Sequence, residues 1–447
     1  MGCGASLEEN RQQQLLRPDL HDWRLELEQH FGKAPHEIPL TQHRGMTLQQ
    51  LSKVIEFTKL RCTSWTDMSP PKFSKTAGQK LTFDIVNLYH VSNWIIEPLT
   101  KDMAVGKYTS CSFVEVVAVS DQVPLWYVSH WWGEPTWSFM KCLERQAELR
   151  CEDGPWWICA YANRQHLLQQ EILSDPTQCS FFKAMQLTKG ILLVIDGAKG
   201  SKKFGSSSGT VFTRIWCQFE VAMTIRLSDE SGYMFDIATV NDSTPILLSD
   251  GFVTADVVKA HSRRINESSC QQDREGGPEG CFPLELVQVA LTSKLEKAEA
   301  SCSNDKVRIL NFIAGQPLDN PLLHQHDAYR ECDERMYSRV AIATWRQAMR
   351  AGKVRKLGLD RALKADQWRE VLRLKLSRCD FKSADLSDIA NALSGLKALK
   401  VFKLSLNNNY TLQSVGEVGA GIATLQALTS LHIDLSYCEN LTSVAEL

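Results

Sequence analysis

The chain has 447 residues, of which 43% are hydrophobic and 23% are charged, and this ordinary globular composition excludes a largely disordered protein. The formal net charge of -2 gives no field that favours nucleic acid or an acidic membrane, and no apolar run reaches the roughly 20 residues that span a bilayer. The 14 cysteines are scattered singly, which argues against a secreted disulfide framework and a structural zinc site and favours reduced thiols in a cytosolic protein.

The N-terminus opens Met1-Gly2-Cys3-Gly4-Ala5-Ser6, the pattern for N-myristoylation at Gly2. One myristoyl chain binds a membrane only marginally, so a second signal is needed, and palmitoylation of Cys3 would supply it. The alternative is a chance match in an N-terminal tail. We expect lipidation, a polar arm over residues 1–45, and a peripheral position on the cytosolic face of a membrane.

A helical N-terminal region is predicted over residues 46–122. Apolar spacing predicts an amphipathic helix over 46–60 and a second helix over about 81–100. The β-branched run 112–119 predicts a strand. We expect this region to pack against the segment that follows it.

Residues 123–265 alternate between strand and helix patterns. The predicted strands are 125–128, 156–161, 191–195 and 233–240, and the predicted helices are 136–150, 180–189 and 214–225. Such alternation predicts a mostly parallel sheet with helices on both faces and a ligand crevice at the carboxyl ends of the strands. No fifth strand is evident after residue 240. A polar loop over 265–281 and helices near 283–315 and 333–351 predict a helical connector over 266–355.

The C-terminal residues 356–447 repeat one pattern three times. Alternating apolar triplets recur 30 and 29 residues apart, and each is followed three residues later by Cys or Asn: Leu372/Leu374/Leu376 with Cys379, Phe402/Leu404/Leu406 with Asn409, and Leu431/Ile433/Leu435 with Cys438. This is the layout of a leucine-rich-repeat solenoid, in which the triplet enters the core and the turn residue satisfies backbone groups. The apolar positions over 386–399 predict a helix on the convex side. No polar cap precedes the last residue, so we expect an incomplete array or an end covered by assembly.

Two motifs resemble the Toll/interleukin-1-receptor (TIR) family. The segment Trp126-Tyr127-Val128-Ser129-His130-Trp131-Trp132-Gly133-Glu134 looks like the first strand and loop of a TIR domain, and Trp216-Cys217-Gln218-Phe219-Glu220 looks like its W-C-x-x-E helix motif. The intervening segment 157–166 is similar to TIR-related proteins of unicellular eukaryotes. The resemblance covers about 120 residues and implies a flavodoxin-like α/β domain.

The resemblance also implies a site. Some TIR domains scaffold signals, and others cleave the glycosidic bond of NAD with the Glu of W-C-x-x-E, a role that falls on Glu220. A carboxylate stabilises the oxocarbenium charge that builds as that bond breaks. The candidate NAD pocket is Ser129, His130, Trp131, Trp132 and Gly133, although the first loop lacks the arginine of many TIR domains. The alternatives are a solvent-facing Glu220 and tryptophans that only pack in the core.

Three other patterns are better explained by ordinary structure than by a functional site. Cys159 with His166, or Cys217 with His130, could pair as a thiol nucleophile, but buried structural cysteine is favoured. The His324, His326 and Asp327 group is typical of a polar loop. The basic segment 197–203 lacks phosphate-loop spacing and indicates a solvated loop.

Three functions remain open from the sequence. The first is a membrane-tethered signalling or adaptor protein whose repeats bind a protein partner and whose TIR-like module self-associates. The second is an NAD glycohydrolase that uses Glu220 and takes NAD as substrate, with no cofactor required. The third is a non-catalytic scaffold. No nucleic-acid partner is expected.

Overall fold

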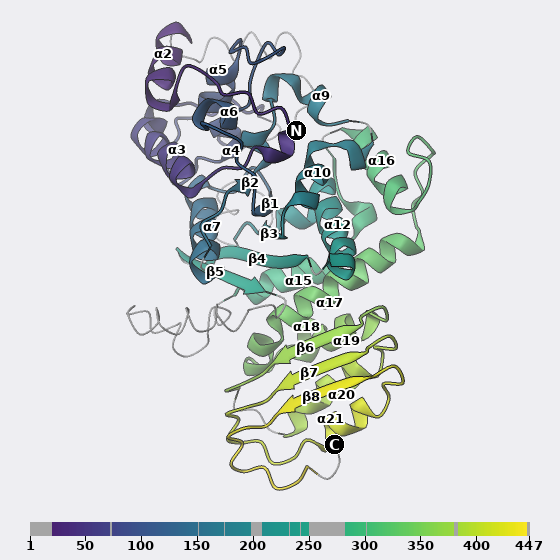
Figure 1. Cartoon of the computed structure of the whole chain (residues 1–447). Coiled ribbons are helices and arrows are strands. Elements are labelled where there is room, and N and C mark those ends of the chain that lie inside the picture. The colour runs from purple at the N-terminus through teal and green to yellow at the C-terminus, as the bar shows by residue number, and fades with distance from the viewer. Residues whose placement is uncertain are drawn as a thin grey trace. The chain divides into compact units, whose positions relative to one another are not determined.

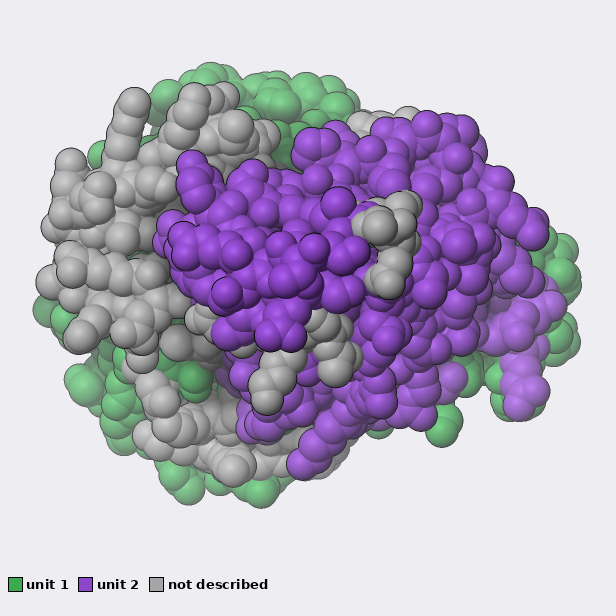
Figure 2. Space-filling model, turned by 90° about the horizontal axis from the view of Figure 1, so that it is seen from below, with its two compact units in different colours: residues 1–247, 296–324 green, residues 248–295, 325–447 purple. Residues whose placement is uncertain are grey.

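The computed structural model describes residues 20–71, 74–150, 152–173, 175–197, 208–231, 233–241, 243–249, 282–300, 302–379 and 383–444. The chain forms two compact units, coloured separately in Figure 2: unit 1 is residues 1–247 and 296–324, and unit 2 is residues 248–295 and 325–447. The predicted connector over 266–355 is therefore divided, since 296–324 belongs to unit 1 and its remainder to unit 2.

The sheet of unit 1 is mostly parallel, as the alternating pattern predicts. Its strands are β1 (Trp126–His130), β2 (Trp156–Trp157), β3 (Gly190–Val194), β4 (Met234–Asn241) and β5 (Thr244–Ser249), in the order β2-β1-β3-β4-β5. The pairs β1–β2, β1–β3 and β3–β4 are parallel. From β1 the chain adds a neighbour first on one side and then on the other, so a topological switch point lies between β1 and β3.

Helices cover both faces of this sheet (Figure 1). Helix α7 (Thr136–Arg150) lies on one face, and α10 (Ser180–Leu187) and α12 (Ile215–Ser231) lie on the other. The same unit contains the helices α8 (Cys159–Ala162), α9 (Leu168–Glu171) and α16 (Ser303–Ile313), of which α16 packs against α12. Successive strand residues point to opposite faces. Accordingly the Trp126 ring lies 5.2 Å from Cζ of Arg150 on α7, whereas the hydroxyl of its neighbour Tyr127 reaches Glu220 on α12.

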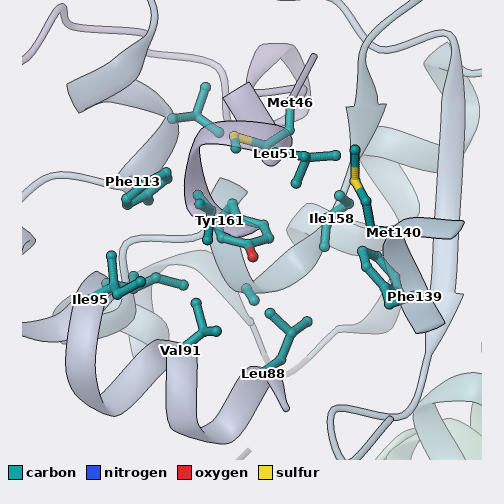
Figure 3. Packing of buried hydrophobic residues seen from close by; sticks show 14 of the residues in the cluster. Met46, Leu51, Leu88, Val91, Ile95, Phe113, Phe139, Met140, Ile158 and Tyr161 are labelled. Carbon is teal, nitrogen blue, oxygen red and sulfur yellow. The ribbon is translucent and has the colours of Figure 1, made fainter. Parts of the chain in front are cut away.

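The N-terminal region packs against this α/β layer, as expected. The helices within the predicted region 46–122 are α3 (Leu48–Arg61), α4 (Leu88–Val91), α5 (Glu97–Thr100) and α6 (Phe113–Val117), with a π-helical turn η3 (Ser92–Ile96) between α4 and α5. The helix α2 (Leu20–Phe31) lies within residues 1–45, where a polar arm was expected, and it buries Trp23, Leu27 and Phe31 because these side chains lie on one face of the helix. One hydrophobic cluster joins both regions. Figure 3 shows Met46, Leu51 and Phe113 of the N-terminal region beside Ile158 and Tyr161 of the sheet layer.

Three local predictions in unit 1 need correction. The predicted strand 112–119 is helix α6, because Ser112 and Glu115 form a capping box: Glu115 N donates to Ser112 Oγ at 3.2 Å and Ser112 N donates to Glu115 Oε2 at 2.8 Å. The predicted helix over 81–100 begins only at Leu88. The predicted strand 156–161 stops at Trp157, and α8 begins two residues later.

A fifth strand, which the sequence did not indicate, is present as β5. It follows β4 after the two residues 242–243 and lies beside β4 in the sheet. Only antiparallel neighbours can be joined by so short a connection, so β5 is an antiparallel edge on a parallel sheet.

Unit 2 contains α15 (Leu284–Thr292), α17 (Asp327–Arg350), α18 (Val354–Leu357), α19 (Leu359–Ala365), β6 (Val371–Lys375), α20 (Ser387–Leu393), β7 (Val401–Ser405), α21 (Gly416–Ile422) and β8 (Ser430–Asp434). The three strands are parallel, with Leu372, Phe402 and Leu431 in one register row. The first two triplets are buried, but Leu431 on the edge strand is 42% exposed.

The turn after each strand repeats as well. Arg378, Asn408 and Tyr437 have left-handed φ values of 55°, 58° and 59°, and each stands one residue before the Cys or Asn of its turn. Asn409 accepts from Cys379 N at 2.7 Å and donates to the carbonyl oxygens of Leu376 and Leu406 at 2.8 and 2.6 Å. The prediction that the turn residue satisfies backbone groups is confirmed at Asn409.

Candidate functional site

Glu220 lies on the face of α12 that meets the sheet. Trp216 fixes the start of this helix, since its Nε1 donates to Asp305 on α16 at 3.0 Å and its ring stacks on Phe181 at 5.0 Å. Glu220 stands four residues further on, one helical turn away, and is only 4% exposed. The alternative of a solvent-facing Glu220 is therefore wrong.

The Glu220 carboxyl accepts a hydrogen bond from Tyr127 Oη, with 2.6 Å between the oxygens. Tyr127 is itself buried on β1, where its ring stacks on Trp157 at 5.2 Å. Burial raises the pKa of Glu220 to about 7, against the lowering effect of the Ser129 and Tyr127 hydroxyls. A carboxyl that titrates near neutral pH can donate a proton or, once ionised, stabilise a developing cation.

Ser129 and Cys217 flank the carboxyl. Ser129 follows Tyr127 by two residues on β1, so both side chains lie on the α12 face of the sheet. Ser129 Oγ is buried and makes no hydrogen bond of ordinary geometry among the described residues. Cys217 Sγ donates to the carbonyl oxygen of His130 at 3.7 Å, and burial raises the thiol's pKa well above its usual range.

His130 points to the other face of the sheet. Its ring lies 4.6 Å from Phe139 on α7, and neither ring nitrogen has a hydrogen-bond partner in the described structure. Burial lowers the pKa of His130 to about 4, so the ring is neutral near pH 7. The predicted pocket is thus divided, because Ser129 and His130 are consecutive strand residues and the sheet separates them.

The loop after β1 holds the two tryptophans by packing. Gly133 leaves room for the Trp131 ring, since a Cβ there would lie 2.2 Å from Cζ2 of that ring. Trp132 Nε1 donates to Cys159 Sγ at 3.2 Å, and its ring lies 5.5 Å from Tyr89. Both tryptophans are half-buried.

Other residues reach this group from outside the two motifs. Burial raises the pKa of Tyr89, and the positive charge of Arg214 partly offsets that effect, so Arg214 lies near the Tyr89 hydroxyl. Arg214 immediately precedes α12. It supplies a positive charge that the loop after β1, which contains no arginine or lysine, does not supply. Sequence reasoning missed both residues, and it missed Tyr127 as the partner of Glu220. Alternation along β1 was the one available signal, since it places Tyr127 with Ser129.

Two more buried acids stand at the carboxyl ends of the strands. Glu134 follows β1 and Asp196 follows β3, on either side of the switch point. Burial raises the pKa of Glu134 to about 8, helped by the charge of Asp196, and burial raises the pKa of Asp196 to about 6. Ser138 donates to Glu134, and Thr210 donates to Asp196 at 2.8 Å.

The weaker patterns gain no support as reactive sites. His166 Nε2 lies 3.0 Å from the carbonyl oxygen of Glu97, and burial raises the pKa of Cys159 to about 12. His326 caps α17 by accepting from Ala328 N at 3.2 Å. Within the described ranges, no three His, Cys, Asp or Glu side chains are placed to hold a metal ion.

Some predicted features lie outside the described residues, namely Gly2, Cys3, the 198–203 part of the basic loop and the polar loop over 265–281. No helix in the described part of the chain is long and apolar enough to cross a bilayer. Comparison of the chain with models of known families, with curated proteins and with solved structures finds no match.

Proposed function

We propose that the chain is a membrane-tethered signalling or adaptor protein, with a TIR-like module in unit 1 and leucine-rich repeats in unit 2. The repetition in unit 2 carries the proposal. Three in-register parallel strands, each followed by a left-handed residue and a turn Cys or Asn, favour a repeat array. Such arrays present an open strand face, which suits protein recognition better than small-molecule chemistry.

The strand order of unit 1 supports the TIR-like part. The order β2-β1-β3-β4 is that of flavodoxin-like domains, and the W-C-x-x-E motif lies on a helix that packs on the β1 face. The antiparallel β5 is a departure from a purely parallel sheet of that type.

Self-association at a membrane tests this proposal. The myristoylated full chain, labelled with two dyes, would be bound to vesicles and its energy transfer compared with that of Gly2→Ala. We expect the wild type to bind vesicles and self-associate there, and the variant to stay in solution as a monomer. Equal vesicle binding by both proteins would remove the anchor, and a monomeric wild type at all surface densities would remove the assembly role.

The second candidate function is NAD glycohydrolysis, and the buried Tyr127–Glu220 pair favours it. The protein at high local concentration should release nicotinamide from NAD, and Glu220→Gln should abolish the release because the variant carries no carboxylate. Glu56→Gln, at an exposed position of α3, is the matched control and should leave any activity unchanged. Absence of nicotinamide release from assembled wild-type protein would exclude this function.

A further inference from the structure

The helical layer of unit 2 begins with a strongly basic segment. Residues 353–364 contain five basic side chains and one acidic side chain, whereas the whole chain has 50 basic and 52 acidic residues. The segment forms α18, α19 and the turn between them, and Figure 1 shows α19 and α20 along one side of the strands β6–β8. A net charge near zero for the whole chain therefore coexists with a local positive field at this surface.

All five basic side chains of this segment are exposed, while the apolar side chains of α18 and α19 are mostly buried. The exposed five are Lys353, Arg355, Lys356, Arg361 and Lys364. We refer to them as the basic surface of unit 2.

The basic surface is continuous across the two helices. Arg361 on α19 reaches back over the turn that joins the helices, since a Cβ at Gly358 would lie 3.0 Å from Nη2 of Arg361. Two other members reach the same neighbouring helix, α20. Arg355 Nη2 donates to Ser387 Oγ at 2.8 Å, and Lys364 Nζ donates to Asn391 Oδ1 at 3.2 Å. The ends of the surface are thus fixed about one turn of α20 apart.

Two carboxyl groups stand among these cations. Asp388 on α20 pairs with Arg355. Asp360 on α19 is buried and accepts a hydrogen bond from Asn391 Nδ2 at 2.9 Å. The next acid along the chain, Asp385, lies on the turn before α20, and that turn packs against α21.

The remaining cations are available to an external anion. Lys353, Lys356 and Arg361 form no side-chain hydrogen bond or ion pair with the residues that the structure describes. Five cations beside two carboxyl groups leave an excess of three positive charges. Because these side chains are long and exposed, they can reach an anionic surface without any change in the fold.

We infer that the basic surface of unit 2 binds the anionic phospholipids of a membrane. The inference rests on the proposed membrane tether and names a second contact for it. One myristoyl chain binds a membrane only marginally, and a basic cluster is one of the signals that can complete such an anchor. Each Lys or Arg beside an anionic leaflet tightens binding about fivefold, so three excess charges have a large effect once an acyl chain holds the protein at the membrane.

The composition of the segment favours lipid over other acidic partners. Residues 353–364 contain no aromatic residue. Binding of single-stranded nucleic acid relies on aromatic stacking, and protein interfaces are usually centred on buried aromatic or arginine side chains. Spread, flexible charges instead suit the mobile headgroups of a lipid surface.

Vesicle binding by the full chain tests the inference. The chain is myristoylated at Gly2 and has an unmodified Cys3, and its affinity is measured by sedimentation with phosphatidylcholine vesicles that either contain or lack phosphatidylserine. We expect the wild type to bind the anionic vesicles at least about tenfold more tightly than the neutral ones, and this gain should shrink at high salt. Lys356→Glu should abolish most of the gain.

The matched control is Lys403→Glu, which makes the same charge change at an exposed position of β7, between the buried Phe402 and Leu404. It should keep the gain, because Lys403 points away from the apolar interior that the helices cover. Lys353→Glu is a second test variant and should behave as Lys356→Glu does, and Lys356→Arg should bind as the wild type does. Circular dichroism checks that each variant is folded.

Three outcomes would overturn the inference. The first is equal binding of the wild type to neutral and anionic vesicles. The second is an equal loss in Lys356→Glu and Lys403→Glu, which would show attraction by net charge alone. The third is displacement of the chain from anionic vesicles by an excess of a peptide of Glu and Ser, or of single-stranded DNA, at a lower charge concentration than the lipid, which would assign the surface to a different partner.

The same experiment separates this inference from the proposed function. If Gly2→Ala bound anionic vesicles as tightly as the myristoylated chain, the anchor would be removed and the basic surface would stand. If the myristoylated chain bound both kinds of vesicle equally and more tightly than Gly2→Ala, the anchor would stand and the basic surface would be removed.

Discussion

Tyr127 donates its phenolic hydrogen to Oε1 of Glu220 at 2.6 Å, joining the first strand of the sheet to a helix 93 residues further along the chain. Both residues are buried, so neither oxygen can turn to water if its partner is lost. The bond holds the carboxyl beside Ser129 and helps set the pH range in which it ionises.

Tyr127→Phe should destabilise the protein by about 1–3 kcal/mol, because it leaves a buried carboxyl without a hydrogen-bond donor. The hydrogen bond lowers the pKa of Glu220, so its loss should raise that pKa further and move the alkaline rise of any NAD cleavage to higher pH. Urea denaturation measures the first effect. Tyr161→Phe, at a buried tyrosine with no hydroxyl partner in the described structure, is the control, and an equal loss there would contradict the role given to the bond.

Glu134→Gln should make stability less dependent on pH. Burial raises the pKa of Glu134 from 4.5 to about 8, so between these values the unfolded chain releases a proton that the folded chain retains. Stability therefore falls as pH rises through that window, by up to about 1.4 kcal/mol per pH unit for this group. Urea denaturation at several pH values from 5 to 8 should show a smaller fall for Glu134→Gln than for the wild type.

The control for this experiment is Glu56→Gln, which changes an exposed carboxyl on α3. Its pH profile should overlay that of the wild type. An unchanged slope in Glu134→Gln would mean that the Glu134 carboxyl is ionised in the folded protein, contrary to its buried position.

Asp236→Asn should cost about 3–5 kcal/mol, because it leaves the buried Arg150 guanidinium without its counter-charge. Asp236 accepts from Arg150 Nε at 3.0 Å and from Gln146 Nε2 at 2.9 Å, so two α7 side chains depend on it. Glu148→Gln changes the solvent-exposed partner of Arg145 on the same helix and should cost less than about 0.5 kcal/mol. Equal decreases in the melting temperature of the two variants would contradict the larger role given to Asp236.

Asn409→Ala should destabilise unit 2 by about 2–4 kcal/mol, since it removes three hydrogen bonds to buried backbone groups of two successive turns. Limited proteolysis with trypsin measures the effect, and the rate of cleavage after Lys356 should be higher in the variant than in the wild type. Asn391→Ala removes a half-buried hydrogen bond from the side-chain amide of Asn391 to Asp360, and it should have a smaller effect. Comparable digestion rates would mean that the turns do not depend on the Asn409 side chain.

Local patterns were read correctly where one interaction dominates. Helix 136–150 agrees with α7 at both ends, because its apolar spacing matches the face that meets the sheet. The repeat spacing placed β6, β7 and β8 in parallel register, since identical units bury the same positions. The strand predicted at 112–119 was wrong because β-branched composition competed with the Ser112–Glu115 capping box, and the helix cap prevailed.

The sequence by itself determined the parallel sheet pattern, the repeat and the W-C-x-x-E segment, all of which depend on spacing along the chain. Only the tertiary structure decided the site. It buried Glu220 against Tyr127 and placed the side chains of Ser129 and His130 on opposite faces of the sheet. It also brought Glu134 and Asp196 together at the carboxyl ends of the neighbouring strands β1 and β3. These relationships join residues that are distant in sequence, and burial changes their ionisation, which no local pattern records.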